Sequence, residues 1–266
     1  MSEKVPEKDI YALPKVVTDL KECGFYHTME IPDHGVVEGE WDLRGNLEAY
    51  LGGTNFKDKR VLDVGAANGC LSFFIENQGA EVISYDLSED YAWDVVPHTG
   101  YDWKQLLVED KQRARELNNA YWFCHRVFHS KAKFVHGTVY TIPQEIGMVD
   151  ISVFGSILLH VRDPFLALEM ASRVTKETIV VVEPMGIKRF LLYILSFGQA
   201  VMTFLPSAKK SEHKVSWWAF TPKIIQEFVC VLGFENVKTK FHFQKYRYSN
   251  FPVLYFTVIG HRKKLS

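Results

Sequence analysis

The sequence predicts an α/β fold built on an open, mostly parallel sheet of seven strands. Three observations predict it: apolar strands alternate with helical stretches over residues 60–232, a glycine-bracketed turn joins the first strand to its helix at 65–69, and strands 236–243 and 253–260 end the chain with no helix between them. Strands that alternate with helices indicate parallel units, and a helix-free final pair indicates an antiparallel hairpin. Helical insertions interrupt the pattern twice.

The composition restricts the classes of function. Of the 266 residues, 47% are hydrophobic, which is enough for one large domain with a substantial core. The balance of 31 Lys and Arg against 32 Asp and Glu argues against a nucleic-acid surface without excluding one. Four scattered cysteines without a C-x-x-C pair argue against a metal site or a disulfide framework. The polar N-terminus shows no secretory signal, so a cytoplasmic protein is expected.

An N-terminal helical cap is expected over residues 1–52. The apolar residues between Val16 and Cys23 give a rough helical stripe, and a short helix over 46–52 would lead into the sheet. The main domain, 53–266, follows this cap.

The turn after the first strand is the most informative segment, with the sequence V-L-D-V-G-A-A-N-G at 61–69. Gly65 and Gly69 can adopt backbone angles that other residues resist, and without a Cβ they let a ligand approach the main chain. The helix over 70–78 would present free N–H groups at its start. The second strand ends at Asp86, about 20 residues after Gly65, where a carboxylate can accept hydrogen bonds from two ribose hydroxyls.

Two classes of cofactor compete for this turn. A dinucleotide site requires G-x-G-x-x-G, whereas this chain has G-A-A-N-G, with Asp63 two residues before Gly65. A turn that binds nothing is the remaining alternative. The pattern resembles motif I of the class I S-adenosylmethionine (SAM) methyltransferases, and this resemblance favours SAM over a dinucleotide.

The first insertion, 91–128, comes soon after Asp86. Before a third strand at 132–135 the chain contains an aromatic loop, 91–103, and one long helix, 104–128. A compact crossover needs far fewer residues. We therefore expect the insertion at the ligand-facing edge of the sheet.

The alternation then resumes with a buried strand at 148–155, a helix at 164–174 and a β-branched strand at 178–182. After the second insertion, 187–212, a helix at 222–232 begins with proline in its first turn.

The second insertion contains a strongly apolar stretch, 190–205. It is shorter than the roughly 20 residues that span a bilayer, and Gly198 interrupts it. Basic pairs flank it at 188–189 and 209–210. A buried or lid helix is one interpretation. The other is a helix that lies at a membrane surface or covers an apolar substrate, which would give lipid contact through 188–206.

The resemblance to class I methyltransferases covers most of residues 25–260. The segment 154–164 is similar to the one that follows the fourth strand in many of these enzymes. The pairs at 26–27 and 217–218 and the G-E-W-D run at 39–42 resemble the group that contains the tRNA wobble-uridine carboxymethyl transferases. The resemblance implies a Rossmann-like fold and SAM as cofactor. The tRNA enzymes of that group carry a longer N-terminal region and basic surfaces, from which this neutral chain departs.

The resemblance also implies which residues bind SAM. They are Asp63 for the amino group, Gly65, Ala67 and Gly69 along the methionine, Asp86 for the ribose, Leu87, Thr138 and Val139 around the adenine, Ser156 and Ile157 at the floor, and Trp41 and Arg44 for the carboxylate. A planar guanidinium suits a carboxylate. Two other roles are equally open: Trp41 could only pack against its neighbours, and Arg44 could form an ion pair on the surface.

Methyl transfer from a sulfonium mainly requires the positioning of two reactants. A hydroxyl or protonated amine acceptor must also lose a proton, and histidine is the usual group for this near neutral pH. His160 follows the fourth strand and is the candidate catalytic base; a role in capping a turn or orienting the loop is the alternative. Tyr26, His27, Trp217 and Trp218 are candidate walls of the substrate site.

The expected function is SAM-dependent methyl transfer to O, N or C of a small, apolar or amphipathic acceptor, with both insertions forming a lid. An RNA or tRNA base methyltransferase is the alternative, and steep salt dependence of binding would favour it. A SAM-binding regulatory protein without activity is a further one. The sequence does not indicate an oligomeric state.

Overall fold

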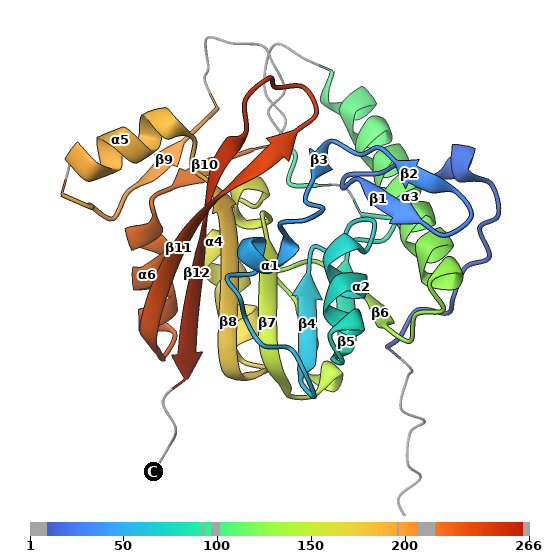
Figure 1. Cartoon of the computed structure of the whole chain (residues 1–266), viewed down its shortest axis with the longest axis horizontal. Helices are drawn as coiled ribbons and strands as arrows, with labels where there is room; N and C mark the ends of the chain where they lie inside the picture. The colour runs from blue at the N-terminus through green and yellow to red at the C-terminus, as the bar shows by residue number, and fades with distance from the viewer. Residues whose placement is uncertain (1–9, 92, 97–101, 196, 207–215, 263–266) are drawn as a thin grey trace, which may run out of the picture.

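An eight-stranded sheet crosses the centre of the computed structural model (Figure 1). Its strands are β3 (Trp41–Asp42), β4 (Arg60–Val64), β5 (Glu81–Asp86), β6 (Lys133–His136), β7 (Val149–Gly155), β8 (Thr175–Pro184), β11 (Phe234–Tyr246) and β12 (Val253–Arg262). The structure describes residues 10–91, 93–96, 102–195, 197–206 and 216–262 of the chain.

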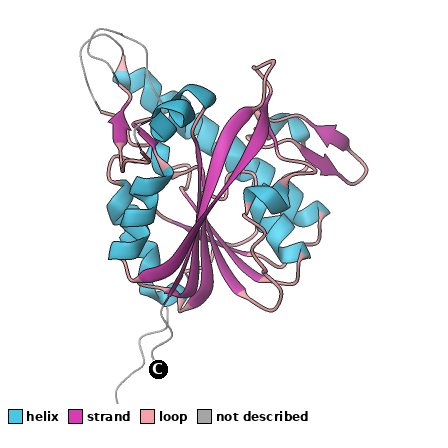
Figure 2. Ribbon diagram, turned by 60° about the vertical axis from the view of Figure 1, so that its left-hand side comes forward, coloured by secondary structure: helices cyan, strands magenta, loops and turns pink. Residues whose placement is uncertain are grey.

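The helices cover both faces of the sheet (Figure 2). They are α1 (Leu47–Tyr50), α2 (Cys70–Asn77), α3 (Trp103–Val127), α4 (Pro164–Ser172), α5 (Ile187–Leu195) and α6 (Pro222–Val231). Three 3-10 helices are η1 (Leu20–Glu22), η2 (Gln144–Ile146) and η3 (Leu158–His160). Two small antiparallel pairs are β1 (Met29–Ile31) with β2 (Gly35–Val37), and β9 (Met202–Phe204) with β10 (Trp218–Phe220).

The strand order is β3-β11-β12-β8-β7-β4-β5-β6. The five strands from β8 to β6 are parallel, whereas β12 and β11 are antiparallel to their neighbours. The strand β5 lies on one side of β4 and β7 lies on the other, so the strand order reverses at β4. Ligands of open α/β sheets bind outside the carboxyl ends of the strands at such a point. The predicted mostly parallel sheet and closing hairpin are confirmed, and β3 adds an eighth strand at the edge by pairing with β11.

Local sequence explains the main elements. The β-branched run of β8 is fully buried from Ile179 to Glu183, as expected for a central strand of a parallel sheet. Proline at the first position of α4 follows Asp163, whose side chain accepts the N–H of Leu166 at 2.9 Å. Asp102 caps α3 in the same way.

The N-terminal segment differs from the expected helix. Its described part, from residue 10 onward, contains only η1 before β1. Residues 10–19 run along the sheet edge, where the N–H of Ala12 donates to the carbonyl of Phe134 at 2.8 Å. Val17 is buried there, so the apolar residues anchor an irregular segment.

The apolar stretch in the second insertion is divided into a short helix and a strand. The helix α5 ends before Phe197 and Gly198, both of which have positive φ, and β9 follows. No helix among the described residues is long and apolar enough to cross a membrane.

Candidate active site

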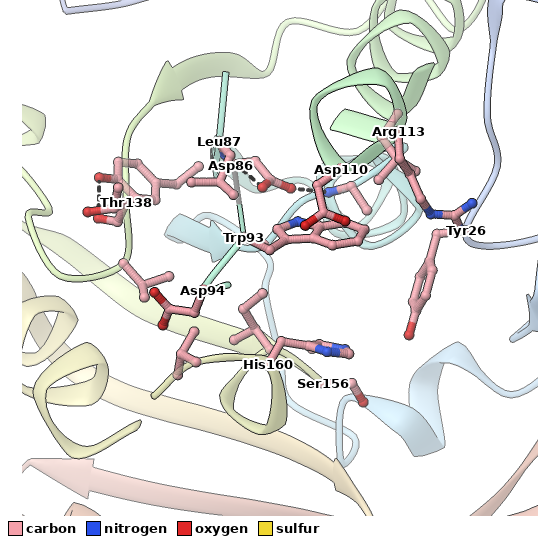
Figure 3. Close-up of a pocket in the computed structure, with 18 of the residues that line it drawn as sticks. Tyr26, Asp86, Leu87, Trp93, Asp94, Asp110, Arg113, Thr138, Ser156 and His160 are labelled. Atoms are coloured by element: carbon pink, nitrogen blue, oxygen red, sulfur yellow. Dashed lines mark hydrogen bonds between the residues drawn. The ribbon is translucent and has the colours of Figure 1, made fainter. Parts of the chain in front are cut away.

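A cavity of about 450 Å³ opens at the carboxyl ends of β4, β5 and β7 (Figure 3). Its lining comes from the glycine turn after β4, the end of β5, residues 93–94 of the first insertion, the first half of α3, the loop after β6, the segment around η3 and the N-terminal segment. This is the edge and the switch point at which an open α/β sheet holds its ligand.

The glycine turn is shaped by positive backbone angles. Gly65, Ala67 and Gly69 have φ of 81°, 48° and 81°. A Cβ on Gly65 would lie 2.9 Å from the side chain of Ile157, which lines the cavity beside it. Gly69 lies outside the described lining; a Cβ there would lie 2.3 Å from the ring of Phe73. Gly65 and Ala67 therefore border the cavity, and Gly69 lets α2 begin against its packing partners.

Asp86 lies at the tip of β5 and lines the cavity. One carboxylate oxygen accepts the N–H of Ala67 at 2.7 Å, and the other accepts the N–H of Leu87 at 2.7 Å. Burial raises the pKa of this carboxyl above its usual value. Each oxygen keeps a further lone pair, so a diol could bind to both. Leu87, Thr138 and Val139 line the same cavity, as the sequence predicts for an adenosine site.

Asp63 is fully buried and lies outside the described lining of the cavity. Its carboxylate accepts the hydroxyl of Ser72 at 2.6 Å, and hydroxyl contacts of 2.7 and 2.8 Å continue through Ser84 to Tyr121 of α3. Burial raises the pKa of Asp63 to about 7. Asp63 thus connects the turn to the helical layer, and its contact with a cofactor amino group stays a prediction.

His160 lines the cavity from η3, near Ser156 (Figure 3), and its backbone N–H donates to the carbonyl of Ile157 at 3.0 Å. Glu183, at the end of β8, holds this segment because its carboxyl accepts the N–H of Leu158 at 2.9 Å. Glu183 is fully buried, and burial raises its pKa well above the usual value. Sequence reasoning missed this residue, although an acid that ends an apolar strand is a visible signal.

Tyr26 and His27 bring the N-terminal segment to the cavity. His27 is 5% exposed, and burial lowers its pKa to about 4, which keeps the imidazole neutral. Its Nδ1 has no hydrogen-bond partner among the described residues. Burial also raises the pKa of Tyr26, and the carboxylate of Glu40 adds to this effect. This end of the cavity therefore combines a neutral imidazole with a phenol.

Trp41 and Arg44 lie outside the described lining of the cavity. The ring of Trp41 packs against Tyr246 with centroids 4.5 Å apart. Arg44 forms an ion pair with Asp42 at 2.8 Å, and this hydrogen-bonded pairing lowers the pKa of Asp42. The structure thus brings neither residue to the described cavity lining. Trp41 packs against an aromatic neighbour, and Arg44 forms a surface ion pair.

Trp217 and Trp218 also lie outside the described lining. The indole N–H of Trp217 donates to the carbonyl of Asp94 at 3.1 Å, and that of Trp218 donates to the carbonyl of Arg162 at 3.0 Å. Asp94 lines the cavity and accepts the hydroxyl of Tyr140. The two indoles therefore support a cavity wall from behind.

The first half of α3 supplies lining residues that sequence reasoning missed. Their spacing of three or four residues places them on one helical face. They are Leu106, Glu109, Asp110, Arg113 and Leu117. Arg113 forms an ion pair with Glu40, and it is the one Lys or Arg in the cavity lining that the structure describes. The helical periodicity predicts that these residues share one face of the helix, but it does not predict that this face lines a cavity.

No protein-family model and no curated protein sequence matches this chain. Solved structures do match. Magnesium protoporphyrin IX methyltransferase from Synechocystis PCC 6803, with SAH bound, is 14% identical, with 82% of this chain and 80% of that chain covered and a TM-score of 0.50. A protein from Bacillus halodurans C-125, described as a methyltransferase, is 13% identical, with 82% and 99% covered and a TM-score of 0.53.

The fold is that of the class I SAM-dependent methyltransferases. The predicted fold class is therefore confirmed. The methyltransferase fold places its cavity where the sequence predicts one, after the glycine turn and Asp86. The narrower resemblance to the tRNA wobble-uridine group stays a prediction.

Proposed function

We propose that the protein is a SAM-dependent methyltransferase that acts on a small-molecule acceptor. The observation that carries the proposal is the carboxylate of Asp86, which the N–H groups of Ala67 and Leu87 hold at the cavity edge within a methyltransferase fold. This arrangement suits the ribose of a nucleoside cofactor.

The remaining lining supports the same cofactor. Leu87 and Val139 offer apolar surface for an adenine, and the turn at Gly65 permits close approach of the methionine portion. Toward the N-terminal segment, the neutral imidazole of His27 could accept a hydrogen bond from an ammonium group through its unprotonated nitrogen. Arg113 could bind a carboxylate in exchange for Glu40.

When bound, SAM supplies an electrophilic methyl group. The protein then has to position the acceptor and, for a hydroxyl or an ammonium, remove its proton. His160 is the candidate base because it lines the cavity from a segment anchored by Glu183. The aromatic and aliphatic lining, including Trp93, Leu106 and Tyr140, supports an apolar or amphipathic acceptor.

Calorimetric titration with SAH tests the cofactor. The wild-type protein should bind it, and Asp86→Ala should weaken binding by about 100-fold, because two hydrogen bonds to a charged acceptor are lost. Asp90→Ala is a matched control, since Asp90 is exposed and lies outside the described lining. Equal affinity of Asp86→Ala and wild type would rule out the ribose assignment.

The role of His160 is tested on the same protein with a panel of acceptors. His160→Ala should lower turnover by about 10²–10⁴-fold and leave SAH affinity within about twofold of wild type. Undiminished turnover would remove His160 as the base. SAH binding without turnover by the wild-type protein on any acceptor would favour a regulatory SAM-binding protein.

A further inference from the structure

The helix α5 exposes an apolar face to solvent. None of its nine residues, all described, is buried. Phe190 and Tyr193 are half-buried against the main core. Five aliphatic side chains of α5 are exposed, and four of them recur at helical spacing, namely Ile187, Leu191, Ile194 and Leu195; the fifth is Leu192. An amphipathic helix normally buries its apolar stripe, so this face requires a partner outside the fold.

The exposed surface continues beyond the helix. Phe197 follows α5 and is 100% exposed, and Phe241 and Phe243 of β11 are exposed as well. The rings of Phe190 and Phe241, with centroids 5.1 Å apart, connect α5 to β11. We call this surface, made by the four aliphatic residues with Phe197, Phe241 and Phe243, the apolar face. Contiguous exposed apolar patches mark interaction sites.

The apolar face is not part of the cavity. Among residues 187–195 and 197–206, none contributes to the cavity lining. The helix instead projects at the periphery of the molecule (Figure 1). It directly follows the carboxyl end of β8, and the cavity opens at that same edge of the sheet. These positions favour a surface helix over a lid that closes the cavity.

The charge around α5 points to a particular partner. Residues 184–206, all described except residue 196, contain two basic residues, Lys188 and Arg189, and no acid, whereas the whole chain has 31 basic and 32 acidic residues. Lys188 and Arg189 belong to α5 itself and are exposed. Apolar helices with a basic surplus bind anionic lipid surfaces in the interfacial plane.

We propose that the apolar face docks this protein on an anionic lipid bilayer. The aliphatic side chains of α5 and Phe197 enter the boundary between headgroups and acyl chains, and Lys188 and Arg189 contact the headgroups. The cavity edge then faces the membrane side of the molecule. This docking does not depend on the identity of the cofactor.

Flotation of the full chain with lipid vesicles tests the docking. The wild-type protein should bind vesicles of phosphatidylcholine and phosphatidylglycerol, and binding should weaken on pure phosphatidylcholine. The double variant Leu191→Gln with Leu195→Gln should bind at least about tenfold more weakly. Each substitution removes the favourable free energy of moving a leucine side chain from water into the bilayer. Leu13→Gln is the matched control, since Leu13 is 86% exposed but lies in the N-terminal segment.

Two results would overturn the proposal: no binding of the wild-type protein to anionic vesicles, or equal binding of the double variant. Self-association that Leu195→Gln abolishes, without vesicle binding, would assign the face to a second copy of the chain. SAH titration of the same variants should match wild type. A failure of docking is thereby distinguishable from a failure of the proposed cofactor.

Discussion

The two insertions contain amphipathic helices that meet opposite environments. The long α3 buries its second half, where Tyr121 and Phe123 are fully inaccessible, and lines the cavity with its first half. The short α5 buries no residue. Both helices have apolar residues at helical spacing. Such spacing therefore predicts an apolar face and leaves open whether core, cavity or external surface covers it.

The packing neighbours of the two helices account for the difference. The helix α3 has 25 residues and packs against β6 and the N-terminal segment through one apolar cluster. The helix α5 has nine residues and ends before the positive φ angles of Phe197 and Gly198, after which the chain turns into β9. The helix α5 has contacts on one side only, so the rest of its circumference stays exposed, whereas α4, also of nine residues, buries five of them.

The strongest test asks whether a buried residue of α3 and an exposed residue directly after α5 differ as much in their contribution to stability as in burial. Phe123→Ala should lower the free energy of unfolding by about 3–5 kcal/mol, because it leaves a cavity in the core. Phe197→Ala is the matched control, since Phe197 is 100% exposed, and it should change stability by less than about 0.5 kcal/mol. Urea unfolding measures both. Similar losses would show that the α5 region is buried in solution, which would contradict the difference between the helices.

The fold could be predicted because its signals are local. The turn from Gly65 to Gly69 and the acid at Asp86 are spaced along one strand–helix–strand unit, so their meeting at one edge follows from the parallel sheet. His160 follows from the same rule, since it comes after the carboxyl end of β7.

The rest of the site depends on tertiary packing. Arg113 and Glu40 meet only because α3 lies across the N-terminal segment, and sequence spacing contains no trace of this contact. Arg44 has the right chemistry for a carboxylate, but its neighbour Asp42 pairs with it on the surface. A cation in the sequence therefore does not identify which cation reaches the cavity.

A second, smaller effect is the pH dependence of stability that comes from Asp63, the acid linked through hydroxyl groups to α3. Burial raises the pKa of Asp63 from 3.8 to about 7, so the folded state holds its proton more tightly than the unfolded state does. The stability that this proton contributes is complete below pH 3.8 and is lost as the pH rises to about 7. The loss is about 2–4 kcal/mol.

Asp63→Asn should remove this part of the pH dependence. Its free energy of unfolding, measured in urea at about pH 4 and about pH 8, should fall less with rising pH than that of wild type. The difference between the two proteins isolates Asp63 from other buried groups such as Glu183 and His27, whose pKa values are also shifted. Parallel profiles would show that Asp63 is ionised in the folded protein at neutral pH.

The test with the smallest expected effect compares how the same substitution on α3 and on α5 changes SAH affinity. Arg113→Met keeps the long apolar stem and removes the guanidinium, so SAH affinity should fall by about tenfold or more through loss of a charge-assisted hydrogen bond. Arg189→Met makes the same change on α5, outside the described lining, and should leave SAH affinity unchanged. Calorimetry measures both. Because the pair of Arg113 with Glu40 is partly exposed, its loss should change stability by less than about 1 kcal/mol. Equal SAH affinities of the two variants would mean that α3 borders the cavity without binding the cofactor, and its charged face would then belong to the acceptor.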